Sequence, residues 1–405
     1  MKVLSKYKNL KLKKYSALLL LLILVLLFGC IEEIDLETET FESALVIEAT
    51  ITDINEKQEI NLSRTFQFEE DGPSAESNAQ VTVLDETGTQ YIFEESPETA
   101  GKYVSTSAFS AQPNRNYQLK ITTASGRNYE SEAVQLPEGT QIDNLYAEEN
   151  INQQGIKGAA ILLDSYNPEG TSNYYRFEYV ETYKIISRFA SDQDLIVVSE
   201  NPPQFDLIPK TQEEEVCYVT VASTSILLAN TNSFTEDRLS GYQVRFIERV
   251  DPIIAQRYSI LVNQNVISRE AYTFYETLKS FSESESLFSQ IQPGFIEGNI
   301  TSLTNENEKV IGIFNATAVS SKRIFFNYID VFDVDDGPPG LFLGDNCGLN
   351  SPDPRALVPI IKNNTAKFVR NGTVEGGEGP YTVAPRFCVD CTVFGSNEVP
   401  EFWVE

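Results

Sequence analysis

Residues 44–53 read ALVIEATITD and residues 58–68 read QEINLSRTFQF, with a short polar turn between them. Both stretches are rich in β-branched residues, and their apolar positions largely alternate with polar ones. Successive side chains of a β-strand point to opposite faces of a sheet, so such alternation is typical of half-buried strands. The sequence therefore predicts that the folded part of the chain opens with two consecutive β-strands.

Strand signals continue from these two segments toward residue 138. The later segments are at residues 79–84, 91–93, 101–104, 116–122 and 129–136. Turn signals such as DETG at residues 85–88 recur at intervals of about eight to twelve residues, which is typical of β-sandwiches. We therefore expect residues 44–138 to form an immunoglobulin-like β-sandwich domain.

The rest of the chain, residues 139–405, is also expected to be mainly β. Its candidate strands are at residues 159–164, 174–186, 217–222, 242–250, 255–264, 309–319 and 322–328. One helix is predicted at residues 268–282, where Ser268 is a suitable N-cap and apolar side chains share one face. The predicted fold class is mainly β, with an N-terminal immunoglobulin-like β-sandwich followed by a larger β-dominated domain that contains one helix.

Residues 1–29 have the pattern of a lipoprotein signal peptide. Residues 1–14 hold six lysines and no acid, and residues 16–29 form an apolar run, SALLLLLILVLLFG. This run is shorter than the roughly twenty residues that a membrane-spanning helix needs. It leads into Cys30 through the lipobox-like sequence Leu-Phe-Gly, so we expect cleavage before Cys30 and attachment of a lipid to its thiol. The alternative is an uncleaved anchor helix with an incidental cysteine.

The segment that follows Cys30 is acidic. Glu32, Glu33 and Asp35 lie within five residues of that cysteine. This pattern is similar to the acidic export signal that sends Bacteroidota lipoproteins to the cell surface. We expect residues 30–43 to be an acidic tether, and the protein to be lipid-anchored in the outer membrane and to face the cell surface. An ordinary solvated tether is the alternative.

The chain is strongly acidic, with a formal net charge of −28. Of its 31 basic and 59 acidic side chains, six lysines lie in the signal peptide, so the mature chain would carry a net charge of about −34. Such a body repels phosphate backbones, which excludes nucleic acid as a partner. It also disfavours direct adsorption on anionic lipid, so the expected contact with the membrane is the N-terminal lipid.

The sequence contains no histidine. This absence excludes hydrolases that use a Ser-His-Asp or Cys-His arrangement, and zinc sites that use histidine ligands. A carboxylate-pair glycosidase or a Ser-Lys hydrolase would not need histidine, but neither has a local signature in this chain. We therefore expect the protein not to be an enzyme.

Four cysteines remain if Cys30 carries lipid: Cys217, Cys347, Cys388 and Cys391. An even number of cysteines in an exported chain indicates disulfides, and four cysteines allow three pairings. The spacing of Cys388 and Cys391 is also found in redox and zinc motifs, but no suitable helix is evident around it. We favour two structural disulfides, at least one of which ties the C-terminal tail to the body of the protein.

An acidic segment near residue 333 is the one metal candidate. Asp330, Asp333, Asp335 and Asp336 supply the oxygen ligands that calcium prefers. Their spacing does not follow the EF-hand pattern, and no glutamate stands where a bidentate ligand is expected. We favour an acidic surface loop and expect no cofactor, with a structural calcium as the alternative.

The blocks LVIEATITD, AQVTVLDETG, PNRNYQLKITTASGRNYES, EKVIGIFNATAVSSKRIFF and FCVDCTVFGSNEVPEFW follow one another in this chain. In order and spacing they resemble the Bacteroidota lipoprotein family called domain of unknown function 4249. The resemblance implies a cell-envelope lipoprotein with an N-terminal β-sandwich, paired with a TonB-dependent outer-membrane receptor. The family carries no assigned catalytic residues.

These observations together predict a surface-exposed outer-membrane lipoprotein that is the accessory partner of a TonB-dependent transporter. Its role would be to capture or gate a substrate at the outer face of the membrane. Two other classes stay open: a structural or adhesive surface lipoprotein, and a carboxylate-based glycan hydrolase.

Overall fold

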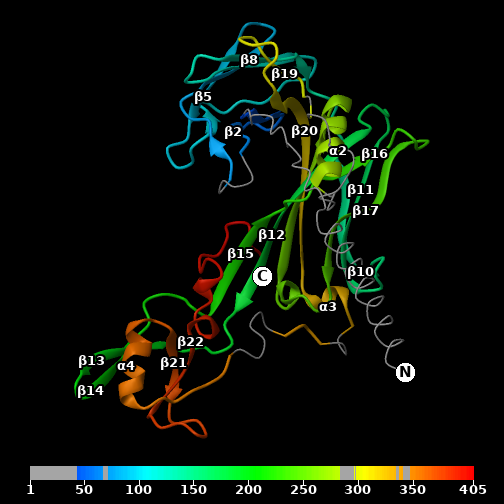
Figure 1. Ribbon diagram of the computed structural model, residues 1–405. Helices are drawn as coiled ribbons and strands as arrows, with labels where there is room; N and C mark the ends of the chain where they lie inside the picture. Colours follow the sequence, from blue (N-terminus) through cyan, green and yellow to red (C-terminus); the bar gives the residue numbers. More distant parts are fainter. Residues whose placement is uncertain (1–42, 67–71, 283–295, 297, 334–336, 341–346) are drawn as a thin grey trace, which may run out of the picture. The chain divides into compact units, whose positions relative to one another are not determined.

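Strands dominate the computed structural model, which describes residues 43–66, 72–282, 296, 298–333, 337–340 and 347–405 (Figure 1). The first strands are β1 (Leu45–Thr52), β2 (Glu59–Arg64), β3 (Ser74–Ala75), β4 (Gln80–Asp85), β5 (Gln90–Glu95), β6 (Lys102–Ser105), β7 (Asn116–Thr122), β8 (Asn128–Ser131) and β9 (Val134–Gln135). The middle strands are β10 (Ile142–Ile151), β11 (Lys157–Asn167), β12 (Tyr174–Ile186), β13 (Gln193–Glu200), β14 (Pro203–Pro209), β15 (Val216–Ala222), β16 (Leu227–Asn230), β17 (Asp237–Glu248) and β18 (Tyr258–Val266). The last are β19 (Ile300–Ser302), β20 (Val310–Phe326), β21 (Ala366–Asn371) and β22 (Tyr381–Pro385).

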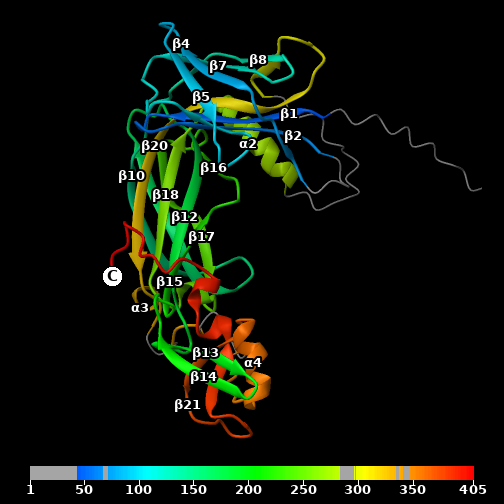
Figure 2. The same ribbon diagram turned by 90° about the vertical axis from the view of Figure 1, so that its left-hand side faces the viewer.

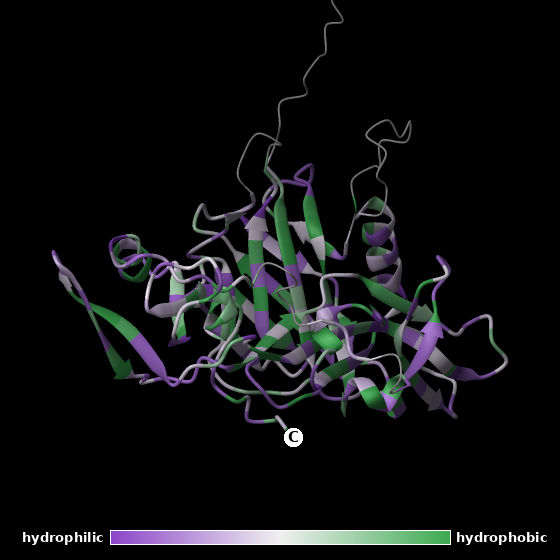
Figure 3. Ribbon diagram, turned by 90° about the horizontal axis from the view of Figure 1, so that it is seen from below, coloured by the Kyte–Doolittle hydropathy of each residue, from purple (hydrophilic) through white to green (hydrophobic). Residues whose placement is uncertain are grey.

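The alternation that predicted the first strand reappears as alternating burial along β1. Leu45, Ile47 and Ile51 are almost fully buried, whereas Glu48 between them is exposed. Figure 3 shows hydrophobic and hydrophilic residues alternating in the same way along several strands. The predicted hydrophobic pattern therefore decides which face of this strand lies in the core.

The N-terminal strands form the sandwich-like region that the turn spacing predicted. Antiparallel pairing links them in the order β1-β2-β6-β5-β4-β7-β8. Strand β19, from much later in the chain, pairs with β8 and so extends this sheet. The expected fold class, mainly β, is confirmed, and the arrangement of the N-terminal strands is sandwich-like.

The 17-residue strand β20 connects this region to the rest of the protein. Its first half pairs in parallel with β1, and its second half pairs antiparallel with β18. The N-terminal strands and the later β12-β18-β20 strands therefore share one continuous hydrogen-bonded sheet. Residues from Ala44 onward belong to one compact unit.

A second, three-stranded sheet of β10, β11 and β17 packs on the β12-β18 strands. The ring of Phe177 on β12 stacks on that of Tyr242 on β17, with centroids 4.6 Å apart. Nearby, the buried carboxylate of Glu181 accepts a hydrogen bond from Arg245 at 3.2 Å and one from the hydroxyl of Tyr258 at 2.6 Å. Aromatic packing and a paired buried charge thus hold the two sheets together.

The predicted helix is present as α2 (Arg269–Ser282), and Ser268 caps it through a 3.1 Å hydrogen bond from the backbone amide of Ala271. The described residues also form two α-helices that the sequence did not reveal, α3 (Tyr328–Val331) and α4 (Pro354–Lys362). The start of α4 has an N-cap and a first-turn proline, but the internal Pro359 is a strong signal against a helix. In the described ranges, no helix has the length and apolar character needed to span a membrane.

Hairpins β13-β14 and β21-β22 pack with α4 into a separate small cluster. Its buried apolar side chains are Leu195, Leu357, Phe368 and Val383. The sequence had not predicted this cluster, because its members come from segments about 190 residues apart in the chain.

Candidate functional site

A cleft of about 720 Å³ has its floor on the outward face of the β1-β20 pair. The parallel register sets Glu48 opposite Ile313, Thr50 opposite Asn315 and Thr52 opposite Thr317, and all six residues line the cleft. Side chains alternate between the two faces of β1, so Leu45, Ile47, Ala49 and Ile51 lie on the opposite face and belong to the hydrophobic core. The two faces of one strand therefore serve the core and the cleft.

Helix α2 and strands β12 and β18 form the walls of the cleft. The helix contributes Phe274, Tyr275 and Leu278, and the two strands contribute Arg176 and Asn265, which are paired opposite each other. Figure 1 shows α2 beside β20, and in Figure 2 α2 is seen next to β1 and β2. The apolar face of the predicted helix thus packs on the fold and also lines this cleft.

The side chain of Asn265 has an unmet hydrogen-bonding requirement. The residue is 7% exposed, and its Nδ2 atom has no hydrogen-bond partner in the described part of the chain. A buried donor left without a partner costs about 1–3 kcal/mol. A water molecule or a bound ligand with an acceptor atom would satisfy it, which makes Asn265 a candidate ligand contact.

Arg176 is held in place between a strand and the helix. Its Nη2 atom donates to Glu178 Oε1 at 2.6 Å, and its Nη1 atom donates to the Tyr275 hydroxyl at 3.4 Å. The guanidinium carbon lies 4.4 Å from the centroid of the Tyr275 ring, a cation–π geometry. These contacts tie β12 to α2 and leave the charge of Arg176 compensated.

The remaining charges give the cleft a negative character. Glu59 is paired with Lys102 at 2.8 Å, and the exposed neighbours Glu56 and Lys57 offset each other in charge. Glu48, in the floor, forms no ion pair within the described ranges. The uncompensated charge of the cleft is therefore a carboxylate.

Apart from the apolar face of the predicted helix, none of these residues was singled out from the sequence, although one signal was present. Strand β18 reads YSILVNQNV, and its adjacent polar residues Asn263, Gln264 and Asn265 interrupt an apolar strand. Consecutive polar side chains point to both faces of a sheet, so at least one must occupy a buried environment. The pattern would have indicated a polar site on this strand.

The two predicted disulfides are confirmed. Cys217 is bonded to Cys391, and Cys347 is bonded to Cys388. The first bridge joins positions 174 residues apart and ties the C-terminal segment to β15. Because Cys388 and Cys391 have different partners, their spacing is not that of a redox disulfide.

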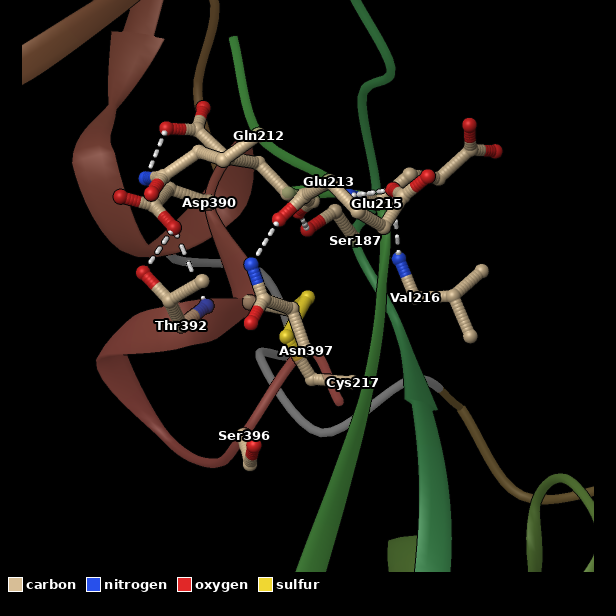
Figure 4. Close-up of a disulfide and its surroundings, with 12 residues drawn as sticks. Ser187, Gln212, Glu213, Glu215, Val216, Cys217, Asp390, Thr392, Ser396 and Asn397 are labelled. Atoms are coloured by element: carbon tan, nitrogen blue, oxygen red, sulfur yellow. Dashed lines mark hydrogen bonds between the residues drawn. A yellow bond between two sulfur atoms is a disulfide. The ribbon is translucent and has the colours of Figure 1, made fainter. Parts of the chain in front are cut away.

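Asp390, which belongs to a group of buried charges, lies close to the Cys217–Cys391 bridge (Figure 4). Asp390 is fully buried and accepts hydrogen bonds from Thr392 and from Arg386 Nε, the latter at 2.8 Å, while Lys367 Nζ lies 3.4 Å away. Burial alone raises the pKa of Asp390, but these hydrogen bonds and the charge of Lys367 outweigh it and lower the pKa below its ordinary value.

Glu214 belongs to the same group of charges. It is contacted by Lys367 and, at 2.7 Å, by Lys210, and all three side chains are largely buried. Burial raises the pKa of Glu214, but hydrogen bonds from Lys210 and Lys367 outweigh it, so the net pKa is lowered. Compensated charges of this kind are best explained as a structural junction between the small cluster and the main sheet.

The structure gives Asp330 a role that needs no metal. Its carboxylate accepts hydrogen bonds from the backbone and side-chain nitrogens of Asn327, at 2.7 and 3.0 Å, and so caps helix α3. Asp333 is described, but Asp335 and Asp336 lie outside the described residues. Within the described ranges, no cluster of three or more Cys, Asp or Glu side chains is arranged to hold a metal ion.

The residues predicted for lipid attachment and export, Cys30, Glu32, Glu33 and Asp35, also lie outside the described residues. Lipid attachment and surface export therefore stay predictions of the sequence.

Comparison with known proteins gives a family but no characterised relative. No curated protein matches the chain. The family model described as domain of unknown function (DUF4249) matches residues 31–323, well over half of the 405 residues, and this range includes every cleft residue named above. The match ends before Cys347, so three of the four bridged cysteines lie beyond it. The chain therefore belongs to the family described as domain of unknown function (DUF4249).

Proposed function

We propose that this protein is a lipid-anchored surface protein of the outer membrane that captures a small ligand for a TonB-dependent transporter. The observation that carries the proposal is the polar cleft of about 720 Å³, in which the buried Asn265 has an unpartnered donor. Cavities of this size are typical of small-molecule binding sites.

Export is supported by two independent features. The signal-like residues 1–29 and the acidic stretch after Cys30 are the first. The second is the pair of disulfides, because such bonds persist in oxidising compartments and are rare in the cytosol. The partner is proposed from the resemblance to lipoproteins that are paired with TonB-dependent receptors.

Binding without catalysis is the activity that the cleft favours. Hydrolysis by a carboxylate pair needs one carboxylic acid and one free carboxylate close together. Two of the four carboxylates that line the cleft are ion-paired, Glu59 with Lys102 and Glu178 with Arg176. Such pairing suits carboxylates that fix structure and recognise a ligand.

The proposal is tested by purifying the tagged full-length protein from native outer membranes in a mild detergent, followed by mass spectrometry. We expect stoichiometric recovery of a TonB-dependent receptor. A Cys30→Ala variant, which lacks the lipid attachment site, is the control for recovery through shared membrane fragments. Recovery of the lipoprotein alone in good yield would contradict the transporter role and favour adhesion. Cleavage of polysaccharide by the pure protein would contradict the non-enzymatic role.

A further inference from the structure

We propose that the cleft beside α2 takes a ligand that carries both a positive charge and a hydrogen-bond acceptor, such as a lysine-containing peptide or an amino-sugar oligomer. This inference rests on the proposed capture function and specifies the class of its ligand. It follows from two side chains that line the cleft: within the described residues, the exposed Glu48 has no ion pair, and the buried Nδ2 donor of Asn265 has no partner.

The positive charge of the ligand follows from Glu48. Glu59 is neutralised by Lys102, and Glu178 is neutralised by Arg176. Glu48 projects from the floor, where its neighbours across the sheet are Asn61 on β2 and Ile313 on β20. Neither neighbour can compensate a carboxylate, so a cation is the complementary group, and an anionic ligand would be repelled.

The acceptor follows from Asn265. Its buried Nδ2 is a donor, and donors are satisfied by carbonyl or hydroxyl oxygens. The almost fully buried Asn315 and Thr317 also line the cleft and add further polar groups near the strand pair. A peptide supplies carbonyl oxygens and an amino sugar supplies hydroxyl oxygens, so both sources share the required chemistry.

The experiment is calorimetric titration of the full-length protein in detergent at low salt. The probes are N-acetylated, C-amidated Gly-Lys-Gly and the trimer of glucosamine. Their uncharged counterparts are acetylated, amidated Gly-Gln-Gly and the trimer of N-acetylglucosamine. We expect one cationic probe to bind at least about tenfold more tightly than its uncharged counterpart, the effect of one charged hydrogen bond. Binding of the Lys peptide would identify the ligand as a peptide, and binding of the glucosamine trimer would identify it as an amino sugar.

Two variants assign the binding to the cleft. Glu48→Gln is expected to weaken binding of the cationic probe about tenfold, whereas Glu94→Gln, an exposed position of the same sheet outside the cleft, leaves it unchanged. Asn265→Leu is expected to weaken binding about tenfold without lowering Tm, because the amide it removes has no partner to lose.

Two results would overturn the assignment: no binding of either cationic probe, or equal weakening by Glu48→Gln and Glu94→Gln. Both are independent of transporter recovery in the membrane purification. If the receptor is recovered and the cationic probes do not bind, the ligand class fails while the accessory role stands. If the probes bind and no receptor is recovered, the ligand class stands alone.

Discussion

Asp390 is completely buried, and its Oδ2 atom lies 2.8 Å from Nε of Arg386, four positions earlier in the chain. Lys367 approaches the same oxygen at 3.4 Å and joins it to Glu214. One buried carboxylate thus compensates cations from two segments of the chain. This relationship makes Asp390 the centre of the junction next to the Cys217–Cys391 bridge.

Replacing Asp390 with asparagine is expected to lower the free energy of unfolding by about 3 kcal/mol, because it leaves the largely buried Lys367 under-compensated. Urea unfolding at pH 7 under non-reducing conditions measures the change. Asp192→Asn, at an exposed position, removes the same charge and should change stability by less than about 0.5 kcal/mol. Equal effects of the two substitutions would show that Asp390 is not the centre of the junction.

Stability should fall as the solution becomes acidic, and this junction should contribute. The folded-state pKa values of Asp390 and Glu214 are lowered from the ordinary values of 3.8 and 4.5. The unfolded chain therefore binds protons first, so the stabilisation is present above about pH 4.5 and is lost as the pH falls through the folded-state pKa values. Urea unfolding between pH 7 and pH 3 should show this decline, and Asp390→Asn should make it shallower. An unchanged slope in the variant would contradict the assignment.

The two disulfides should differ in their contribution to stability. Chain entropy in the unfolded state predicts a loss of about 5 kcal/mol on removing the Cys217–Cys391 bridge and about 4 kcal/mol for Cys347–Cys388, because the loops span 174 and 41 residues. Paired Cys→Ser variants, compared by chemical denaturation, give the two values. The single tryptophan, Trp403, reports on the C-terminal segment, since it is buried against Tyr218 and Phe325.

Lipid attachment at Cys30 predicts a change in partitioning. Cys30→Ala should abolish incorporation of labelled palmitate and move the protein out of the detergent phase in a Triton X-114 separation. Cys30→Ser gives the same prediction and controls for side-chain size. Persistent palmitate incorporation in both variants would locate the lipid on another residue.

The proposed surface export rests on the acidic residues after Cys30 and predicts that their replacement changes the face of the membrane on which the protein is found. Replacing Glu32, Glu33 and Asp35 with their amides should reduce surface exposure, measured by digestion with an added protease in intact cells. The total amount of protein in the outer membrane should stay the same. Full surface exposure of the triple variant would show that these acids form an ordinary solvated tether.

The elements that the sequence predicted are those determined by local pattern. The alternation of apolar and polar residues identified β1, because in a strand that alternation determines which side chains face the core and can be read from adjacent residues alone. The sequence pattern of β1 could not reveal that Leu45 pairs with Val310, because this parallel contact joins segments more than 260 residues apart. The sequence allowed three pairings of the four cysteines, and the structure shows which one is formed.

The cleft was missed for the same physical reason. Glu48 reads as an ordinary outward residue of an alternating strand, and only the packing of α2 and β18 around it makes its position distinctive. Tyr275 lies within the predicted helix, but the position of Arg176 against its ring depends on tertiary structure. Asn265 differed from its surroundings even in the sequence, as a polar residue in an apolar strand.

Strand β1 has a mechanical consequence under the proposed anchoring at Cys30. Any pull between the membrane and the body of the protein enters the fold at the first residue of this strand. The strand is hydrogen-bonded along both sides, antiparallel to β2 and parallel to β20. A load along its axis is shared by the bonds of both ladders, so they do not open one at a time from an end. Under this anchoring, the first strand to bear the load is one that is hydrogen-bonded on both sides.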